Sequence, residues 1–88
     1  MENQNPLTQL PNIGCVVAEK LSQAGINTPE ELIAIGSEQA FIRLQTIDSS
    51  ACFSMLQALE GAVQGVRWHK LTKERKAQLK AFYDLKRI

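Results

Sequence analysis

Helix punctuation constrains the fold of this chain most strongly, because signals that end one helix and start the next recur every ten to fifteen residues over its 88 residues. One stop signal is especially clear. Gly25 suits the left-handed position after the last turn of a helix, and Ile26 would then fold back onto Leu21 in a Schellman motif. Alternating runs of Val, Ile or Thr are missing. The sequence therefore predicts an all-α protein.

A start signal follows directly in the segment TPEEL. Thr28 is predicted to be the N-cap, Pro29 the first helical residue and Glu31 the reciprocal partner of a capping box. We expect this helix to stop at Gly36, and Ser37 to cap a short helix that comes next.

Four further helices are expected from punctuation and apolar periodicity. They are NPLTQL with Asn5 as its N-cap, residues 13–24, a longer helix from Asp48 or a neighbouring serine to about Gly65, and a last helix capped by Thr72. The apolar positions of the longer helix are Cys52, Met55, Leu56, Leu59 and Val63. A chain of this length supports one small core, so we expect a single domain over residues 1–88 in which residues 1–6 are a flexible tail.

Charge is unevenly distributed, although the formal net charge is only +1. Residues 1–66 carry two basic and seven acidic residues, a balance of −5, whereas residues 67–88 carry eight basic and two acidic residues, a balance of +6. An anionic partner is therefore expected to meet the C-terminal quarter of the chain.

The last helix is predicted to be amphipathic. Its apolar side is formed by Leu71, Leu79, Phe82 and Leu85. The opposite side carries a basic stripe within about 60° of helix surface, made of Lys73, Lys76, Lys80 and Arg87. Such a stripe is either a solvated face, a surface that tracks nucleic-acid phosphates, or a patch for an acidic protein.

The turn from Leu10 to Gly14 has the form of a helix-hairpin-helix turn, with Asn12 in place of its first glycine. Backbone N–H groups exposed at the start of the following helix can bind phosphate. Asn tolerates positive φ, so the turn can form, but its side chain could itself cap the N–H of Gly14 or Cys15. Two interpretations stay open: a phosphate clamp at Asn12, Ile13 and Gly14, or a structural corner.

Several function classes find no support in the sequence. The N-terminus lacks the basic and apolar regions of a signal peptide, and no apolar run approaches the roughly 20 residues of a membrane span. We therefore expect a cytoplasmic protein without a membrane partner. Cys15 and Cys52 are expected to be reduced core residues. With His69 they are too few for zinc, which needs about four ligands.

No catalytic constellation is visible either. His69 lacks a partner at a persuasive spacing, and Trp68 is expected to anchor the last helix against the core. Gly61 and Gly65 lie one helical turn apart and form a smooth surface that we interpret as tight intramolecular packing. We expect no enzymatic activity, no cofactor, no metal and no small-molecule substrate.

Two segments, LPNIGCVVAEKLSQAGINTPEELIAIG and LQALEGAVQGVRWHKLTKERKAQL, with AFIRL between them, resemble the C-terminal domain of the TfoX/Sxy family of bacterial competence regulators. The resemblance covers almost the whole chain from about Leu7, as if that domain stood alone without the family's N-terminal domain. It implies a compact bundle of about five short helices with a helix-hairpin-helix-like start, similar to sterile-alpha-motif-like folds. It also implies a role near regulation of natural transformation genes, with DNA or a transcription regulator as partner.

Two hypotheses for function follow. The first is a non-enzymatic regulatory domain that makes weak, sequence-independent nucleic-acid contact near transcription. The residues expected to make this contact are Arg67, Lys70, Lys73, Lys76 and Lys80, with Asn12, Ile13 and Gly14 as a second, backbone site. The alternative is a protein-interaction module, or a homo-oligomer, that does not bind DNA and uses the opposite charges of the two chain regions and the glycine surface.

Overall fold

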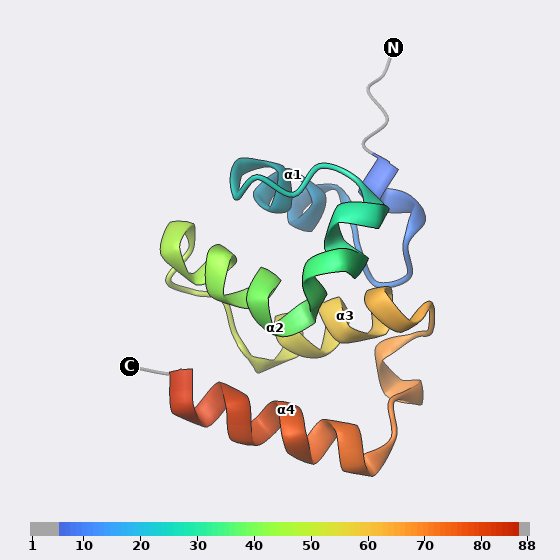
Figure 1. The fold of residues 1–88 in the computed structure, drawn as a ribbon, viewed down its shortest axis with the longest axis vertical. Coiled ribbons are helices and arrows are strands. Elements are labelled where there is room, and N and C mark those ends of the chain that lie inside the picture. The colour runs from blue at the N-terminus through green and yellow to red at the C-terminus, as the bar shows by residue number, and fades with distance from the viewer. Residues whose placement is uncertain (1–5, 87–88) are drawn as a thin grey trace.

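The computed structural model describes residues 6–86 (Figure 1). The expected N-cap Asn5, the tail residues before Pro6, and Arg87 of the predicted stripe lie outside the described residues. The elements in chain order are η1 (Pro6–Gln9), α1 (Cys15–Gln23), α2 (Pro29–Ile47), α3 (Phe53–Gln64), η2 (Trp68–Lys70) and α4 (Lys73–Lys86). This part of the chain contains no strand, so the all-α prediction is confirmed.

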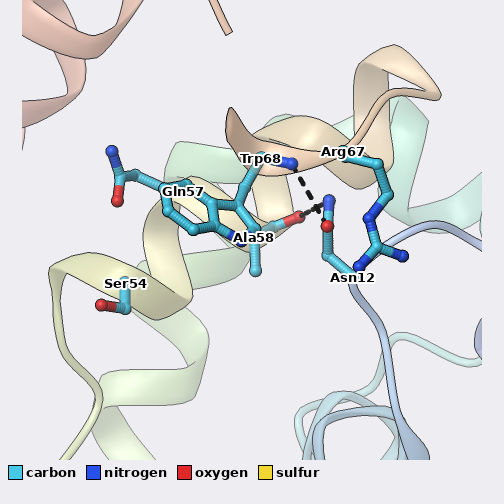
Figure 2. Close-up of a pocket in the computed structure, with 6 residues that line it drawn as sticks. All are labelled: Asn12, Ser54, Gln57, Ala58, Arg67 and Trp68. Atoms are coloured by element: carbon cyan, nitrogen blue, oxygen red, sulfur yellow. Dashed lines mark hydrogen bonds between the residues drawn. The ribbon is translucent and has the colours of Figure 1, made fainter. Parts of the chain in front are cut away.

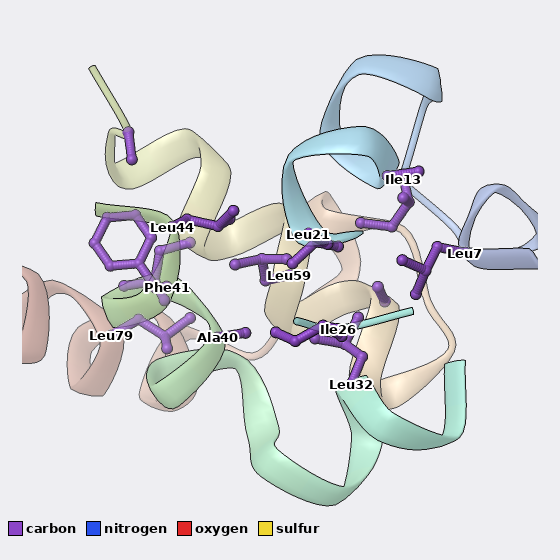
Figure 3. Close-up of a cluster of buried hydrophobic side chains, with 14 of the residues drawn as sticks. Leu7, Ile13, Leu21, Ile26, Leu32, Ala40, Phe41, Leu44, Leu59 and Leu79 are labelled. Atoms are coloured by element: carbon purple, nitrogen blue, oxygen red, sulfur yellow. The ribbon is translucent and has the colours of Figure 1, made fainter. Parts of the chain in front are cut away.

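Helix α3 lies in the middle of the molecule, with α1 and α4 at opposite ends of the view in Figure 1. It packs against α2, η2 and α4. The fully buried large side chains come from α1, α2, α3, α4, η1 and the loop after α1 (Figure 3): Leu7, Leu21, Ile26, Leu32, Phe41, Leu44, Leu56, Leu59 and Leu79. One core therefore joins all four α-helices.

The predicted stop and start signals are confirmed. Gly25 has φ +90°, and the Ile26 N–H donates to the carbonyl oxygen of Leu21 at 2.8 Å, as a Schellman motif requires. The Glu31 N–H donates to Oγ1 of Thr28 at 3.1 Å, which confirms the predicted N-cap, whereas the Glu31 carboxylate accepts the N–H of Asn27 at 2.6 Å rather than that of Thr28. These local hydrogen bonds fix where α1 ends and α2 begins.

Gly36 interrupts α2 with non-helical backbone at φ 83° and ψ 163°. If α2 is counted as two segments, the described residues hold five α-helical segments, which agrees with the bundle of about five short helices that the resemblance implies; the sixth predicted helix, NPLTQL, is the 3-10 helix η1. The cap predicted at Ser37 is wrong, because this side chain is buried and its hydroxyl donates to Oε1 of Glu60 at 2.6 Å. Flexibility of φ at glycine, rather than a side-chain cap, makes the kink.

The start of α3 also differs from the prediction. Its N-cap is Cys52, while Asp48 is the C-cap of α2 and forms an ion pair with Lys20. Cys52 and Cys15 are both exposed free cysteines, so the prediction that they belong to the core is wrong. Cys15 is the first residue of α1 and Cys52 is the N-cap of α3, so both lie at a helix end that faces solvent.

Helix α4 is capped by Thr72, whose Oγ1 accepts the Arg75 N–H at 3.1 Å, as predicted. Leu85, predicted to face the core, is instead 81% exposed. It follows Leu79 by six residues and therefore lies about 120° away from it around the helix. Tyr83 takes the core-facing position, four residues after Leu79.

A hydrogen-bonded carboxylate ties three helices together. Glu60 of α3 is only 6% exposed. Its Oε1 accepts from Nη2 of Arg75 on α4 at 3.0 Å and from Ser37 on α2, and its Oε2 accepts from Nε2 of Gln64 at 2.5 Å. Burial alone would raise the pKa of Glu60, but these hydrogen bonds and the Arg75 charge lower it to about 2. The carboxylate is therefore ionised in the folded domain.

Because the pKa of Glu60 is lower in the folded state than its ordinary 4.5, this residue stabilises the fold above about pH 4.5. That contribution is lost as pH falls from about 4.5 to about 2. We expect Glu60→Gln to cost on the order of 2 kcal/mol at pH 7. The difference from the parent should shrink toward zero near pH 2, as urea denaturation at several pH values would show.

Glu38→Gln is the matched control, since Glu38 contacts the same Arg75 at 3.4 Å but is more exposed. It should cost less than about 1 kcal/mol. If both variants lose the same free energy of unfolding at pH 7, the buried Glu60–Arg75 contact stabilises the fold no more than the exposed Glu38–Arg75 contact does.

Candidate nucleic-acid interface

The hairpin turn leads directly into α1. Asn12 has φ +70°, which agrees with the prediction that Asn can replace the usual glycine. Ile13 is buried in the core, whereas Gly14 is exposed and is the N-cap of α1 without any side-chain cap. A Cβ atom at Gly14 would meet no atom within 4 Å. The start of α1 is therefore open to an approaching phosphate.

The Asn12 side chain does not cap α1. Its Nδ2 donates to the carbonyl oxygens of Val66 at 3.1 Å and Ala58 at 3.4 Å, and its Oδ1 accepts the Trp68 N–H at 3.2 Å. Figure 2 shows the amide reaching from the hairpin turn to this segment. Two regions separated by more than 50 residues in sequence are thereby joined into one surface.

Gly61 makes room for this contact. A Cβ atom there would lie 2.6 Å from the carbonyl oxygen of Val66 and closer still to the amide nitrogen of Asn12. The expected tight intramolecular packing is thus present at Gly61. Gly65 serves differently, as the left-handed C-cap that ends α3 at φ 78°. The two glycines therefore do not form one open surface for a partner.

Trp68 lies at the surface rather than against the core, so its predicted anchoring role is wrong. Its side chain is 46% exposed. The ring of His69 meets it edge-on with centroids 5.8 Å apart, and Nζ of Lys76 lies 5.8 Å from its ring centroid. Leu71, which is buried directly before α4, makes the hydrophobic contact that was expected from Trp68.

The predicted basic residues lie along one region of η2 and α4. Arg67, Lys70 and Lys73 are exposed, and Lys76 is half-buried over Trp68. Lys80 lies farther along α4, where its Nζ is 5.9 Å from the ring of Phe53 and donates to Oδ1 of Asp84 at 3.1 Å. Lys76 and Lys80 therefore contact aromatic rings and are not part of a purely solvated face.

Free and paired cations can be distinguished within residues 6–86. Lys20, Arg75 and Lys80 form ion pairs with carboxylates. Four of the predicted site residues form no such pair with a described residue: Arg67, Lys70, Lys73 and Lys76. Of these four, Arg67 lies beside Asn12 of the hairpin turn and Lys76 lies over Trp68, while Lys80 is partly neutralised by Asp84.

Sequence reasoning missed part of this surface. Ser54, Gln57 and Ala58 of α3 line a pocket of about 370 Å³ together with Asn12, Arg67 and Trp68 (Figure 2). Their spacing of three and four residues places them on one helix face. This spacing can be read from the sequence. The sequence does not show that Asn12, Arg67 and Trp68 lie opposite this helix face.

Two further observations bear on the kind of site. Within the described residues, no group of three His, Cys, Asp or Glu side chains could hold a metal ion. No helix in the same part of the chain is long and apolar enough to cross a membrane.

The fold is a small helical domain that begins with a hairpin turn and ends with a basic helix. Residues 3–83 match the TfoX C-terminal domain, and the chain belongs to this family. No curated protein matches the chain.

Two crystal structures of proteins from Listeria monocytogenes are similar to it. One, in a triclinic form, is described as uncharacterized; it is 53% identical over 90% of each chain with a TM-score of 0.89. The other, a protein of unknown function in a tetragonal form, is 53% identical over 90% of this chain and 96% of that one, with a TM-score of 0.88.

The geometry at Gly61 predicts the effect of a single methyl group. We expect Gly61→Ala to destabilise the domain by about 1–3 kcal/mol, because the Val66 carbonyl is backbone and cannot move away without shifting η2. Gly14→Ala, where the space is open, should change stability by less than about 1 kcal/mol. Urea denaturation of both variants measures this, and equal stabilities would contradict the described packing.

Proposed function

We propose that this domain is a non-enzymatic module that makes weak, sequence-independent contact with nucleic acid in a regulatory process near transcription. The observation that carries the proposal is the contact of Asn12 with Val66 and Trp68. It brings the uncapped start of α1 next to Arg67, so that backbone donors and a free cation share one surface. Membership of the TfoX C-terminal domain family supports the regulatory context.

The physical basis is attraction to phosphate. The first N–H groups of α1 lack helical acceptors, and the positive end of the helix dipole favours an anion there. The four unpaired cations add point charges that release counterions from a nucleic-acid backbone. These groups recognise phosphate rather than base edges in a groove, so the contact is independent of sequence.

We expect affinity for a short labelled DNA duplex to fall steeply with salt in fluorescence anisotropy. Each phosphate neutralised contributes about −0.9 to the slope of log K against log salt, so four contacts give about −3.6. Arg67→Gln should lower the magnitude of this slope by about 1. No detectable binding at about 50 mM salt would refute the proposal.

Arg43→Gln is the matched control for this experiment. Arg43 is an exposed arginine on α2 without an ion pair to a described residue, so the change in net charge is identical. Its slope and affinity should stay close to those of the parent. An equal effect of both variants would mean that only net charge matters and that the interface is not where we place it.

The contribution of the hairpin can be tested separately with Val16→Glu. Val16 is 66% exposed in the first turn of α1. A carboxylate there suits the helix dipole but repels phosphate, so stability should stay within about 0.5 kcal/mol. Duplex affinity at low salt should fall several-fold.

Ile33→Glu provides the comparison, since Ile33 is a 50% exposed β-branched residue near the start of α2. It should leave duplex affinity nearly unchanged. If Val16→Glu and Ile33→Glu bind duplex equally well, the hairpin makes no phosphate contact and only the basic segment remains.

A further inference from the structure

The pocket between α3 and η2 is lined in part by polar side chains that make no hydrogen bond or ion pair to other described residues. Its volume is about 370 Å³, within the range of roughly 300–1,000 Å³ typical of small-ligand sites. Ser54, Gln57 and Ala58 form the α3 side, and Arg67 and Trp68 come from the segment that follows α3. None of the six lining residues is acidic. The pocket therefore suits a ligand that is neutral or anionic.

Three polar groups of the pocket are uncommitted within the described residues. The hydroxyl of Ser54, the amide of Gln57 and the guanidinium of Arg67 make no hydrogen bond or ion pair to any residue between 6 and 86. Asn12 differs, because its amide is already bonded to Ala58, Val66 and Trp68. The free groups supply a hydroxyl, an amide that both donates and accepts, and a planar cation.

The apolar part of the lining is aromatic. Trp68 leaves nearly half of its side-chain surface exposed, and Ala58 adds a small apolar contact on α3. Nζ of Lys76 lies 5.8 Å from the centroid of the indole, so a second cation besides Arg67 lies close to the aromatic surface. An exposed indole beside cations is the arrangement by which proteins stack unpaired nucleobases next to their phosphates.

We propose that this pocket binds one nucleotide, with the base against Trp68 and Ala58, the base edge toward Gln57 and Ser54, and the phosphate on Arg67. Figure 2 shows Arg67 and Ser54 on opposite sides of Trp68, which matches a ligand with an anionic end and a polar planar end. The nucleotide is either free or an unpaired residue of a single strand. A base inside a duplex is excluded, because both of its faces are covered by neighbouring bases.

The proposal deepens the proposed function, since Arg67 serves both, but it does not depend on duplex binding. Trp68 is the single tryptophan of the sequence, so its fluorescence reports on the pocket directly. The full chain is titrated with adenosine 5′-monophosphate, the single strand dA6 and inorganic phosphate. Tryptophan fluorescence and amide chemical shifts are recorded in parallel.

Adenosine monophosphate or dA6 should change Trp68 fluorescence and shift the amides of Ser54, Gln57 and Trp68. Binding of both indicates a site for any exposed nucleotide; binding of the monophosphate alone identifies a free nucleotide as the ligand, and binding of dA6 alone identifies a single strand. Inorganic phosphate should shift Arg67 only. If phosphate reproduces the whole pattern, or if neither nucleotide shifts these amides, the proposal is overturned.

Variants separate stacking from folding. Trp68→Ala should weaken nucleotide binding about 10-fold or more, measured by amide shifts, and Trp68→Phe should recover part of it. Gln57→Ala should weaken binding several-fold, whereas Gln39→Ala, an exposed glutamine on α2, should not. Unchanged nucleotide affinity in Trp68→Ala would overturn the proposal.

Duplex affinity measured on the same proteins distinguishes the two proposals. Gln57→Ala should keep the salt-dependent duplex binding of the parent, because it removes no charge and Gln57 belongs neither to the hairpin turn nor to the four unpaired cations. Nucleotide binding without duplex binding would refute the proposed function and leave the pocket assignment standing. Duplex binding without nucleotide binding would do the reverse.

Discussion

The contact between Asn12 and the backbone around Gly61 is the constraint on which the interface depends. The Asn12 amide satisfies acceptors at Ala58 and Val66 and a donor at Trp68, while its own backbone takes the positive φ that the hairpin turn needs. Only a residue without Cβ fits at position 61 beside it. A hydrogen-bonded amide packed this closely holds the first and last quarters of the chain in one arrangement.

Helix α3 uses neighbouring residues to hold both ends of the molecule. Gly61 receives the hairpin, and Glu60 binds Arg75 of α4. The contact between Glu60 and Arg75 also separates paired from unpaired cations. Arg75 forms ion pairs with Glu60 and Glu38, whereas Arg67 and Lys76 form none with a described residue. Fewer cations of the C-terminal quarter are therefore unpaired than its charge balance suggests, and two of them, Arg67 and Lys76, lie beside Trp68.

Much of the fold could be predicted from the sequence because the interactions that start and end a helix involve residues close to each other in sequence. The stop at Gly25, the cap at Thr28, the left-handed end at Gly65 and the cap at Thr72 each depend on residues within one turn. Errors arose where the decision was not local. Ser37 has the residue type of an N-cap, but its hydroxyl donates to Glu60 of α3, which is 23 residues away in sequence.

For the candidate site, the sequence by itself determined two ingredients: a hairpin turn with Asn12 in place of its first glycine, and a basic C-terminal quarter that includes Arg67. Only the tertiary structure decided that they meet. Asn12 could have capped its own helix, and Trp68 could have entered the core; the preference for α3 and η2 rests on acceptors 46 and 54 residues away. Local patterns carry no information about such distant partners, because packing of the whole core sets which helix faces which.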